Sequence, residues 1–330
     1  MTEPVENIQV DAVITWVNGN DKNWQKKINA YSDSKINFSS ENHLKRYNSI
    51  GEINIAIRSI IKFAPFIKNI YLVTDNQKPQ SFASLKSLAQ ENGVNLELVD
   101  HKVIFRGFEE YLPTFNSCSI ISMLFKIPNL SEHFIIFNDD FFVMKEVSVN
   151  DFFINGEPII RGKWQLFNEN RPLRKIYRKV LTYLNIPVKN DKISFKKRQQ
   201  NSAKLVQMDK YVRRFHTPVS VRKSTLINFF KKDPTLLRNN IQYRFRNKNQ
   251  FLISSLSEHL EIKNNTYHYR NYPQLTYFRS YKNLRLTRLK LKWFKKDQNK
   301  LFITFQSLDM ANDETLDYIL NWINKRLSKN

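Results

Sequence analysis

Residues 134–144 read Phe134-Ile135-Ile136-Phe137-Asn138-Asp139-Asp140-Phe141-Phe142-Val143-Met144. Four apolar residues followed by an abrupt polar change indicate a short buried strand that ends near Asn138. Two adjacent carboxylates at the end of a buried strand are costly unless a positive partner meets them. Because Asp oxygens are hard ligands, the motif predicts that Asp139 and Asp140 bind Mg²⁺ or Mn²⁺. The alternative is a turn whose carboxylates are solvated or cap the next helix.

The segments around this motif alternate between strands and helices. Apolar, β-branched runs predict strands at 8–17, 70–74, 94–99 and 301–305. Helical spacing and capping residues predict helices at 21–31, 53–64, 80–91, 117–127 and 314–327. This order predicts an α/β fold with a Rossmann-like, mainly parallel sheet covered by helices. Ligands gather at the carboxyl ends of such strands, which is where Asp139 and Asp140 should lie.

The character of the chain changes after Val147. Residues 148–260 read as basic loops and as helices at 171–184, 199–214, 222–231 and 248–260. We therefore predict a Rossmann-like, metal-binding core over 1–150 and a basic helical lobe over 151–260 that closes over the sheet. Residues 261–330 should return to the core. Within them, residues 284–294 alternate apolar and basic and could form an edge strand or a membrane-surface helix.

The chain is strongly basic, with 53 Lys and Arg against 30 Asp and Glu, a formal charge of +23. Such a charge predicts an anionic partner: nucleic acid, phospholipid headgroups or a charged polymer. Residues 171–214 hold fourteen Lys and Arg against two Asp, and residues 281–300 hold eight against one. We expect the first run, including Lys196, Lys197 and Arg198, to hold a charged polymer. The second run, with Arg285, Arg288, Lys290 and Lys292, is better suited to anionic membrane lipids.

Cysteine usage and the lack of targeting signals predict where the protein works. Cys118 is the single cysteine, so no intrachain disulfide can form and a reducing compartment is expected. No apolar run reaches about 18 residues, and the N-terminus lacks the pattern of a signal peptide. These features predict a cytoplasmic protein that can also sit peripherally on the inner face of the plasma membrane.

Four ordered blocks of sequence carry a resemblance to a known family. The first is Asp11-Ala12-Val13-Ile14-Thr15-Trp16-Val17-Asn18-Gly19-Asn20-Asp21. The second runs from Arg46-Tyr47 through Glu52 and Arg58-Ser59-Ile60 to Phe63-Ala64-Pro65-Phe66 and Ile70-Tyr71-Leu72-Val73-Thr74-Asp75-Asn76-Gln77. The third holds Leu112-Pro113-Thr114-Phe115-Asn116-Ser117, then Ile127-Pro128-Asn129-Leu130-Ser131-Glu132-His133-Phe134 and Asn138-Asp139-Asp140. The fourth is His216-Thr217-Pro218, followed by Arg244-Phe245-Arg246.

Over roughly residues 8–250 these blocks resemble the Stealth proteins, sugar-1-phosphate transferases of capsule and exopolysaccharide synthesis. The resemblance implies transfer of a hexose-1-phosphate, such as N-acetylhexosamine-1-phosphate, from a UDP-sugar donor to a hydroxyl of an anionic glycan acceptor. The product would be a phosphodiester, with UMP released. Such chemistry asks for a metal, cationic donors and a base for the acceptor hydroxyl.

The resemblance also implies roles for individual residues. Asp139 and Asp140 would be the metal and general-base pair, with Asp140 closest to the chemistry. His216 is a second acid or base candidate, and Arg246 would grip a phosphate with its planar guanidinium. The nucleotide and donor pocket would be lined by Asp11, Asn18, Gly19, Asp21, Arg46, Glu52, Arg58, Asp75 and Gln77. Asn116 and Ser117 would cap the following helix and contact the substrate.

This chain departs from the family pattern at two places. After Phe-Asn-Ser the family usually has Ile-Glu, and that Glu is implied in catalysis, whereas this chain has Ile120-Ile121. We expect Ile121 to pack in the core and another carboxylate, Glu52 or Asp75, to supply the role. Ser49-Ile50 also stands where the family usually has Asp-Asn.

Two other functions compete with sugar-1-phosphate transfer. A metal-dependent glycosyltransferase would use the same acidic motif but break the bond at the sugar carbon and release UDP. A nucleic-acid-binding protein would use the positive charge. The basic runs carry no recognisable nucleic-acid motif, and the acidic pair would repel phosphate without a metal, so nucleic acid is not expected as a partner.

Overall fold

The computed structural model describes residues 8–40, 51–184 and 194–328. Its central element is a five-stranded sheet in the order β3-β2-β1-β4-β9. The strands are β1 (Val10–Thr15), β2 (Ile67–Thr74), β3 (Asn95–Asp100), β4 (His133–Asn138) and β9 (Val219–Arg222). β1 to β4 are mutually parallel, and only β9 runs antiparallel, against β4. The predicted α/β fold with a mainly parallel sheet is confirmed.

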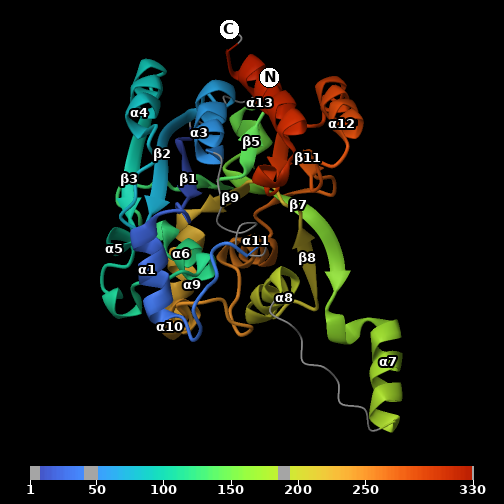
Figure 1. Ribbon diagram of the computed structural model, residues 1–330. Coiled ribbons are helices and arrows are strands. Elements are labelled where there is room, and N and C mark those ends of the chain that lie inside the picture. Colours follow the sequence, from blue (N-terminus) through green and yellow to red (C-terminus); the bar gives the residue numbers. More distant parts are fainter. Residues whose placement is uncertain (1–7, 41–50, 185–193, 329–330) are drawn as a thin grey trace.

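Alternating side chains of this sheet enter two cores. In β1, Ala12 and Ile14 enter one core and Val13 enters the other, as the two-residue period of a strand requires. The first core is covered by α3 (Glu52–Phe63), α4 (Phe82–Glu91), α12 (Leu284–Lys296) and α13 (Asp313–Ser328). The second is covered by α5 (His101–Ile104), α6 (Ser117–Ser122), α9 (Lys223–Lys232), α10 (Pro234–Ile241) and α11 (Ile253–Asn264). Helices therefore cover both faces of the sheet (Figure 1).

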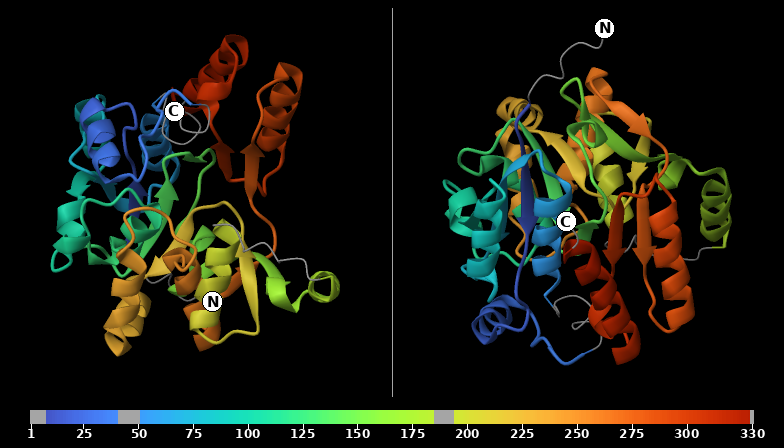
Figure 2. Two further views of the ribbon diagram at one scale, coloured as in Figure 1. Left: turned by 60° about the horizontal axis from the view of Figure 1, so that its bottom comes forward. Right: turned by 90° about the horizontal axis from the view of Figure 1, so that it is seen from above.

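Two smaller sheets adjoin the central one. One contains β5 (Phe141–Val143), β11 (Leu275–Phe278) and β12 (Phe302–Phe305). The other contains β6 (Phe153–Ile154), β7 (Glu157–Leu166), β8 (Lys210–Arg214) and β10 (His268–Arg270). Figures 1 and 2 show α12 and α13 side by side next to β11 and β12, so the end of the chain returns to the core. The connection between β4 and β5 consists of Asp139 and Asp140, which lie where the chain leaves one sheet for the next.

Residues 151–260 contain strands as well as the predicted helices. α7 (Pro172–Tyr183), which stands away from the rest of the chain, and α8 (Phe195–Leu205) are helical as expected (Figure 1). The helix predicted over 199–214 is wrong beyond Leu205, because the chain turns there and forms β8 against β7. The strands β7 and β9 and the helix α10 were not predicted. Their pairing is long-range, and local periodicity does not report it.

The remaining elements are short or were predicted only in outline. Residues 284–294 lie within a helix, so the edge-strand alternative is wrong. Thr287, Leu291 and Phe294 are buried at helical spacing. The helix predicted over 117–127 is split into α6 and a single 3₁₀ turn, Leu124–Lys126. Further 3₁₀ turns are Glu109–Tyr111, Val149–Asp151, Asn168–Asn170 and Leu308–Met310. None of the helices in the described ranges could span a lipid bilayer, because none combines sufficient length with sufficient apolar character.

Candidate active site

The carboxylates after β4 crowd one another. Burial, then the charge of Asp140, then that of Glu52 raise the pKa of Asp139 to about 7. Glu52 begins α3 and is itself buried, so the helix brings a third carboxylate toward the pair. Asp140 Oδ1 is buried and has no hydrogen-bond partner. Negative charge is thus concentrated at this point, with one oxygen left for a positive group.

A divalent cation fits this arrangement. No three His, Cys, Asp or Glu side chains in the described part of the chain converge as an all-protein metal cage would require. Mg²⁺, however, keeps several waters and usually binds one or two carboxylates together with substrate phosphates. Asp139 and Asp140, with the unpartnered Oδ1, suit that mode of binding. They would hold the ion, and a diphosphate substrate would supply further oxygens.

His216 lies beside Asp140 although the two are distant in sequence. Its Nε2 is 3.6 Å from Asp140 Oδ2, and the two side chains are 38% and 26% exposed. The imidazole packs edge-on against Phe141, with ring centroids 4.6 Å apart, and lies 5.4 Å from the ring of Tyr277. A half-exposed imidazole held between aromatic rings and a carboxylate can reach a substrate and exchange a proton with it.

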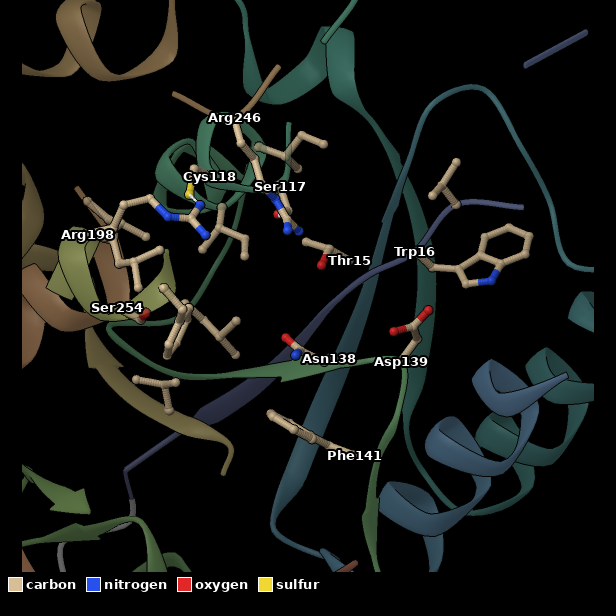
Figure 3. Close-up of a pocket in the computed structure, with 18 of the residues that line it drawn as sticks. Thr15, Trp16, Ser117, Cys118, Asn138, Asp139, Phe141, Arg198, Arg246 and Ser254 are labelled. Atoms are coloured by element: carbon tan, nitrogen blue, oxygen red, sulfur yellow. Dashed lines mark hydrogen bonds between the residues drawn. The ribbon is translucent and has the colours of Figure 1, made fainter. Parts of the chain in front are cut away.

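A cavity of about 640 Å³ opens along this edge of the sheet (Figure 3). Its lining includes four of the residues predicted for the active site: Asp139, His216, Ser117 and Arg246. The labelled side chains in Figure 3 form two groups, with Asp139 and Trp16 in one and Cys118, Ser117, Arg198 and Arg246 in the other. Thr15 and Asn138, which are register partners at the ends of β1 and β4, lie between these groups. The cavity therefore has an acidic end and a cationic end.

Asn116 and Ser117 connect the cationic end to the fold. Asn116 Oδ1 accepts a hydrogen bond from the Cys118 amide at 3.1 Å, so it caps α6 as predicted. Its Nδ2 donates to the carbonyl oxygens of Tyr243 and Phe245 at 2.9 and 3.0 Å. Because Asn116 is fully buried, it positions the loop that carries Arg246 and does not contact a substrate. Ser117 Oγ accepts a hydrogen bond from Arg246 Nη2 at 3.1 Å.

The loops after β1 and β2 meet through Gln77. Its amide donates to the Asn18 carbonyl at 3.1 Å and to Asp21 Oδ2 at 3.0 Å, and it accepts from the Asn18 amide at 2.8 Å. The hydrogen bond from Gln77 is the main cause that lowers the pKa of Asp21, which also caps α1 (Lys22–Tyr31). Gly19 belongs to the same turn and accepts from Gln25. The structure thus brings these predicted residues to the carboxyl edge of the sheet, beside the cavity residues Thr15, Trp16 and Val17.

Several predicted residues lie elsewhere. Asp11 lies at the amino end of β1, where its buried carboxylate accepts from Asn69 and from the Ser131 amide at 2.8 Å each. A strand rises about 3.3 Å per residue, so Asp11 is far from the carboxyl edge and supports the fold instead. Arg58 lies within α3 and is not part of the cavity lining. Arg46 falls outside the described residues.

The structure also tests the expected substitutes for the missing family Glu. Ile121 is half-buried and packs against the second core, but it also lines the cavity, so the expectation of simple core burial is wrong. Asp75 is occupied by Lys27, whose Nζ lies 2.7 and 2.8 Å from its two oxygens. Glu52, whose charge acts on Asp139, is therefore the better candidate for the additional carboxylate.

The cavity is also lined by three basic residues that were not predicted for the site: His101 was missed, and Arg198 and Arg214 were expected only as members of the basic run 171–214. Arg198 is only 5% exposed, which corrects its placement in a surface track with Lys196 and Lys197. Arg214 Nε lies 3.3 Å from Glu258 Oε1. Burial lowers the pKa of His101 to about 4, so its imidazole is neutral. Nothing in a basic run distinguishes an inward-facing arginine from its solvated neighbours.

Comparison with known proteins agrees with the order of these motifs. The family model "Stealth protein CR1, conserved region 1" matches residues 9–36, and "Stealth protein CR2, conserved region 2" matches residues 46–159. The capsular polysaccharide phosphotransferase of Neisseria meningitidis serogroup B is 31% identical over 261 residues, 75% of this chain and 62% of that protein. The capsular polysaccharide phosphotransferase cps1A of Actinobacillus pleuropneumoniae is 38% identical over 154 residues, 45% of this chain and 39% of that protein.

The matched segments span less than two thirds of either relative. Among solved structures, the apo form of the bifunctional glycosyltransferase WbbM aligns with 100% of this chain and 51% of its own, at 13% identity and a TM-score of 0.48. Conserved regions 1 and 2 of the Stealth proteins therefore follow each other in order over residues 9–159 of this chain.

Proposed function

We propose that this chain transfers a sugar-1-phosphate from a UDP-sugar to a hydroxyl of an anionic glycan in the synthesis of a capsular or other surface polysaccharide. The observation that carries the proposal is the Asp140–His216 pair, which lies next to Asp139 at one end of a cavity whose other end is cationic. Phosphoryl transfer needs both features, a base for the incoming hydroxyl and cations for the phosphates. The printed names of the relatives above, phosphotransferases of capsular polysaccharide, support the same reaction class.

In this reaction the acceptor oxygen attacks the phosphorus that carries the sugar. The bond between that phosphorus and the bridging oxygen breaks, and UMP leaves. The hydroxyl proton passes to the Asp140–His216 pair, in which Asp140 holds and orients the imidazole. Arg246 and the Ser117 hydroxyl, already joined to each other, donate hydrogen bonds to phosphate oxygens. When bound by Asp139 and Asp140, Mg²⁺ or Mn²⁺ would offset charge on the diphosphate.

A glycosyltransferase is the second candidate, because the same acidic motif and cavity could serve attack at the sugar carbon. The two reactions differ in the bond that breaks, and hence in the nucleotide released. The experiment is incubation of the purified chain with a panel of UDP-sugars and a glycan acceptor, with and without EDTA. We expect UMP, and no turnover in excess EDTA. Release of UDP would replace the proposal with glycosyl transfer, and absence of any nucleotide product would reject both.

We further propose that the outer face of α12 contacts anionic lipids. Leu286, Leu289 and Trp293 are 58%, 45% and 64% exposed and follow one another at helical spacing. The helix also carries six Lys and Arg and no acidic residue. An exposed apolar stripe that contains Trp and is flanked by cations is typical of a helix that lies in the headgroup region of a membrane.

A further inference from the structure

Arg198 is a buried cation that no carboxylate of the described residues neutralises. It is 5% exposed and lines the cavity from α8. Arg214, which also lines the cavity, is paired with Glu258 at 3.3 Å, and Arg222 on the neighbouring strand β9 is paired with Glu261. Arg198 Nη1 donates to the sulfur of Cys118, and its Nε is buried without a hydrogen-bond partner. No ion pair is found for Arg198 among the described residues.

The thiol does not offset this charge. Burial raises the pKa of Cys118, although the guanidinium groups of Arg198 and Arg246 act in the opposite direction, so the sulfur remains a neutral and weak acceptor. Burying a charge without a counter-charge is strongly destabilising. An anion that enters the cavity and binds this buried cation would therefore stabilise the fold.

The surroundings of Arg198 favour a phosphate. Both guanidinium groups lie close enough to Cys118 to act on its titration, and Arg246 also holds the Ser117 hydroxyl. Figure 3 shows these four side chains gathered together. Planar guanidinium groups and a hydroxyl, arranged around one point, match the several oxygens of a phosphate ester.

We propose that Arg198, with Arg246 and Ser117, forms a phosphate-binding subsite at the cationic end of the cavity. The ligand is a phosphate ester of a substrate, either the diphosphate of the donor or a phosphodiester already present in the acceptor. This inference rests on the proposed function for the identity of those substrates. The competing role for Arg198 is a structural clamp that joins α8 to α6 through Cys118.

Calorimetric titration with inorganic pyrophosphate tests the subsite without any transfer reaction. We expect saturable binding to the intact chain and about a tenfold or greater loss of affinity in Arg198→Gln, the scale of one charge-assisted hydrogen bond. Arg213→Gln is the matched control, because Arg213 is exposed on β8 and its loss changes the net charge equally. The proposal is overturned if Arg198→Gln and Arg213→Gln bind pyrophosphate with equal affinity. If the melting temperature is then lower only for Arg198→Gln, the role of Arg198 is that of a structural clamp.

The single cysteine supplies a second measurement that needs no substitution. Cys118 lines the cavity beside Arg198, and because its thiol ionises only at alkaline pH, slow modification by a small methanethiosulfonate reagent at such a pH reports on this one position. Phosphate binding should slow the modification. Protection by UDP but not by a glycosyl phosphodiester assigns the subsite to the donor, and the reverse assigns it to the acceptor. If neither compound protects, the subsite does not exist; if pyrophosphate binds while no UDP-sugar is turned over, the subsite stands and the proposed reaction fails.

Discussion

Asp139 and Asp140 owe their chemistry to their position between two strands. β4 and β5 each fix one side of the pair, so the carboxylates cannot move apart. Burial of Asp139, together with the charges of Asp140 and Glu52, raises its pKa to about 7. Asp140 uses one oxygen toward His216, while the other is buried and unpartnered. The proposed role in catalysis would account for this costly arrangement.

The variant Asp140→Asn tests that role. Asparagine keeps the shape of the side chain but removes its charge and its basicity. We expect the rate of nucleotide release to fall by about 10²-fold or more, the range for loss of acid–base or electrostatic catalysis. The melting temperature should fall little or even rise, since the repulsion with Asp139 is lost. An unchanged rate in the folded variant would remove Asp140 from the mechanism.

His259 makes stability sensitive to acid. Its Nδ1 donates to the Ser255 carbonyl at 2.6 Å, and its Nε2 accepts from the Val212 amide at 3.0 Å, so the buried ring has no room for a second proton. Burial lowers its pKa to about 4, from 6.5 in the unfolded chain. Between these values the unfolded state binds more protons, so stability rises with pH and is lost as pH falls from about 6.5 toward 4.

This contribution is on the order of 3 kcal/mol and can be isolated by substitution. Urea unfolding of the intact chain and of His259→Gln should be compared at several pH values from 4 to 7.5. We expect a shallower dependence on pH in the variant, because glutamine does not titrate. If the free energy of unfolding depends on pH in the same way in both proteins, groups other than His259 cause the loss of stability in acid.

At the scale of elements, Gly162 lets β7 and β8 approach. A Cβ at this position would lie 2.5 Å from Val212 Cγ1 and 2.8 Å from the Arg213 carbonyl oxygen. The carbonyl belongs to the backbone of β8, which also carries Arg214 toward the cavity and leads to His216. A substitution at this crossing should therefore disturb both stability and the site.

Gly162→Ala should lower the free energy of unfolding by about 1–3 kcal/mol, as overpacking of a close contact does. Adding Val212→Ala relieves the contact with the side chain but not the contact with the backbone, so it should not restore stability. Urea titration measures both effects. Full stability in Gly162→Ala would mean that the two strands can move apart without cost.

The exposed face of α12 offers a separate test at this scale. Replacing Leu289 and Trp293 with serine removes apolar surface, and reversing the charge of Arg285 and Lys292 removes attraction to anionic headgroups. We expect each double variant to lose most of its sedimentation with vesicles that contain phosphatidylserine. Ile227→Ser, at an exposed apolar position on α9, is the control and should bind normally. Binding that survives both double variants would assign membrane contact to another surface.

At the scale of the whole molecule, the cavity joins segments from three parts of the chain. Asp139 comes from the parallel sheet, Arg198 and His216 from residues 151–260, and Gln306 from the last third. A ligand that spans the cavity therefore links parts that unfolding would separate. Linkage predicts that such a ligand stabilises the entire fold.

We expect Mg²⁺ and UDP together to raise the melting temperature more than the sum of their separate effects. The reason is that a diphosphate supplies metal ligands that the two aspartates alone lack. The part of this rise that exceeds the sum of the separate effects should disappear in Asp139→Asn and in excess EDTA. If the rise in melting temperature with both ligands is only the sum of the two separate rises, no metal is held between Asp139, Asp140 and the diphosphate.

The sequence by itself determined the features that depend on neighbouring residues. Apolar runs along 8–17 and 134–137 predicted buried strands, and Asp21 and Asn116 predicted helix caps that the structure contains. The acidic motif was placed at the end of β4 because a buried strand cannot accept unpaired carboxylates. These signals are local, and so a linear pattern reveals them.

Only the tertiary structure decided which polar residues share the site. Asp11 lies in the same block as Asn18, but the direction of β1 carries it to the opposite end of the sheet. Arg198 lies next to Lys197 in a basic run, yet it turns inward toward Cys118. The segment after Leu205 becomes a strand because β7 provides a partner. Burial and pairing depend on contacts between segments far apart in the chain, and the identity of a residue and its neighbours does not contain that information.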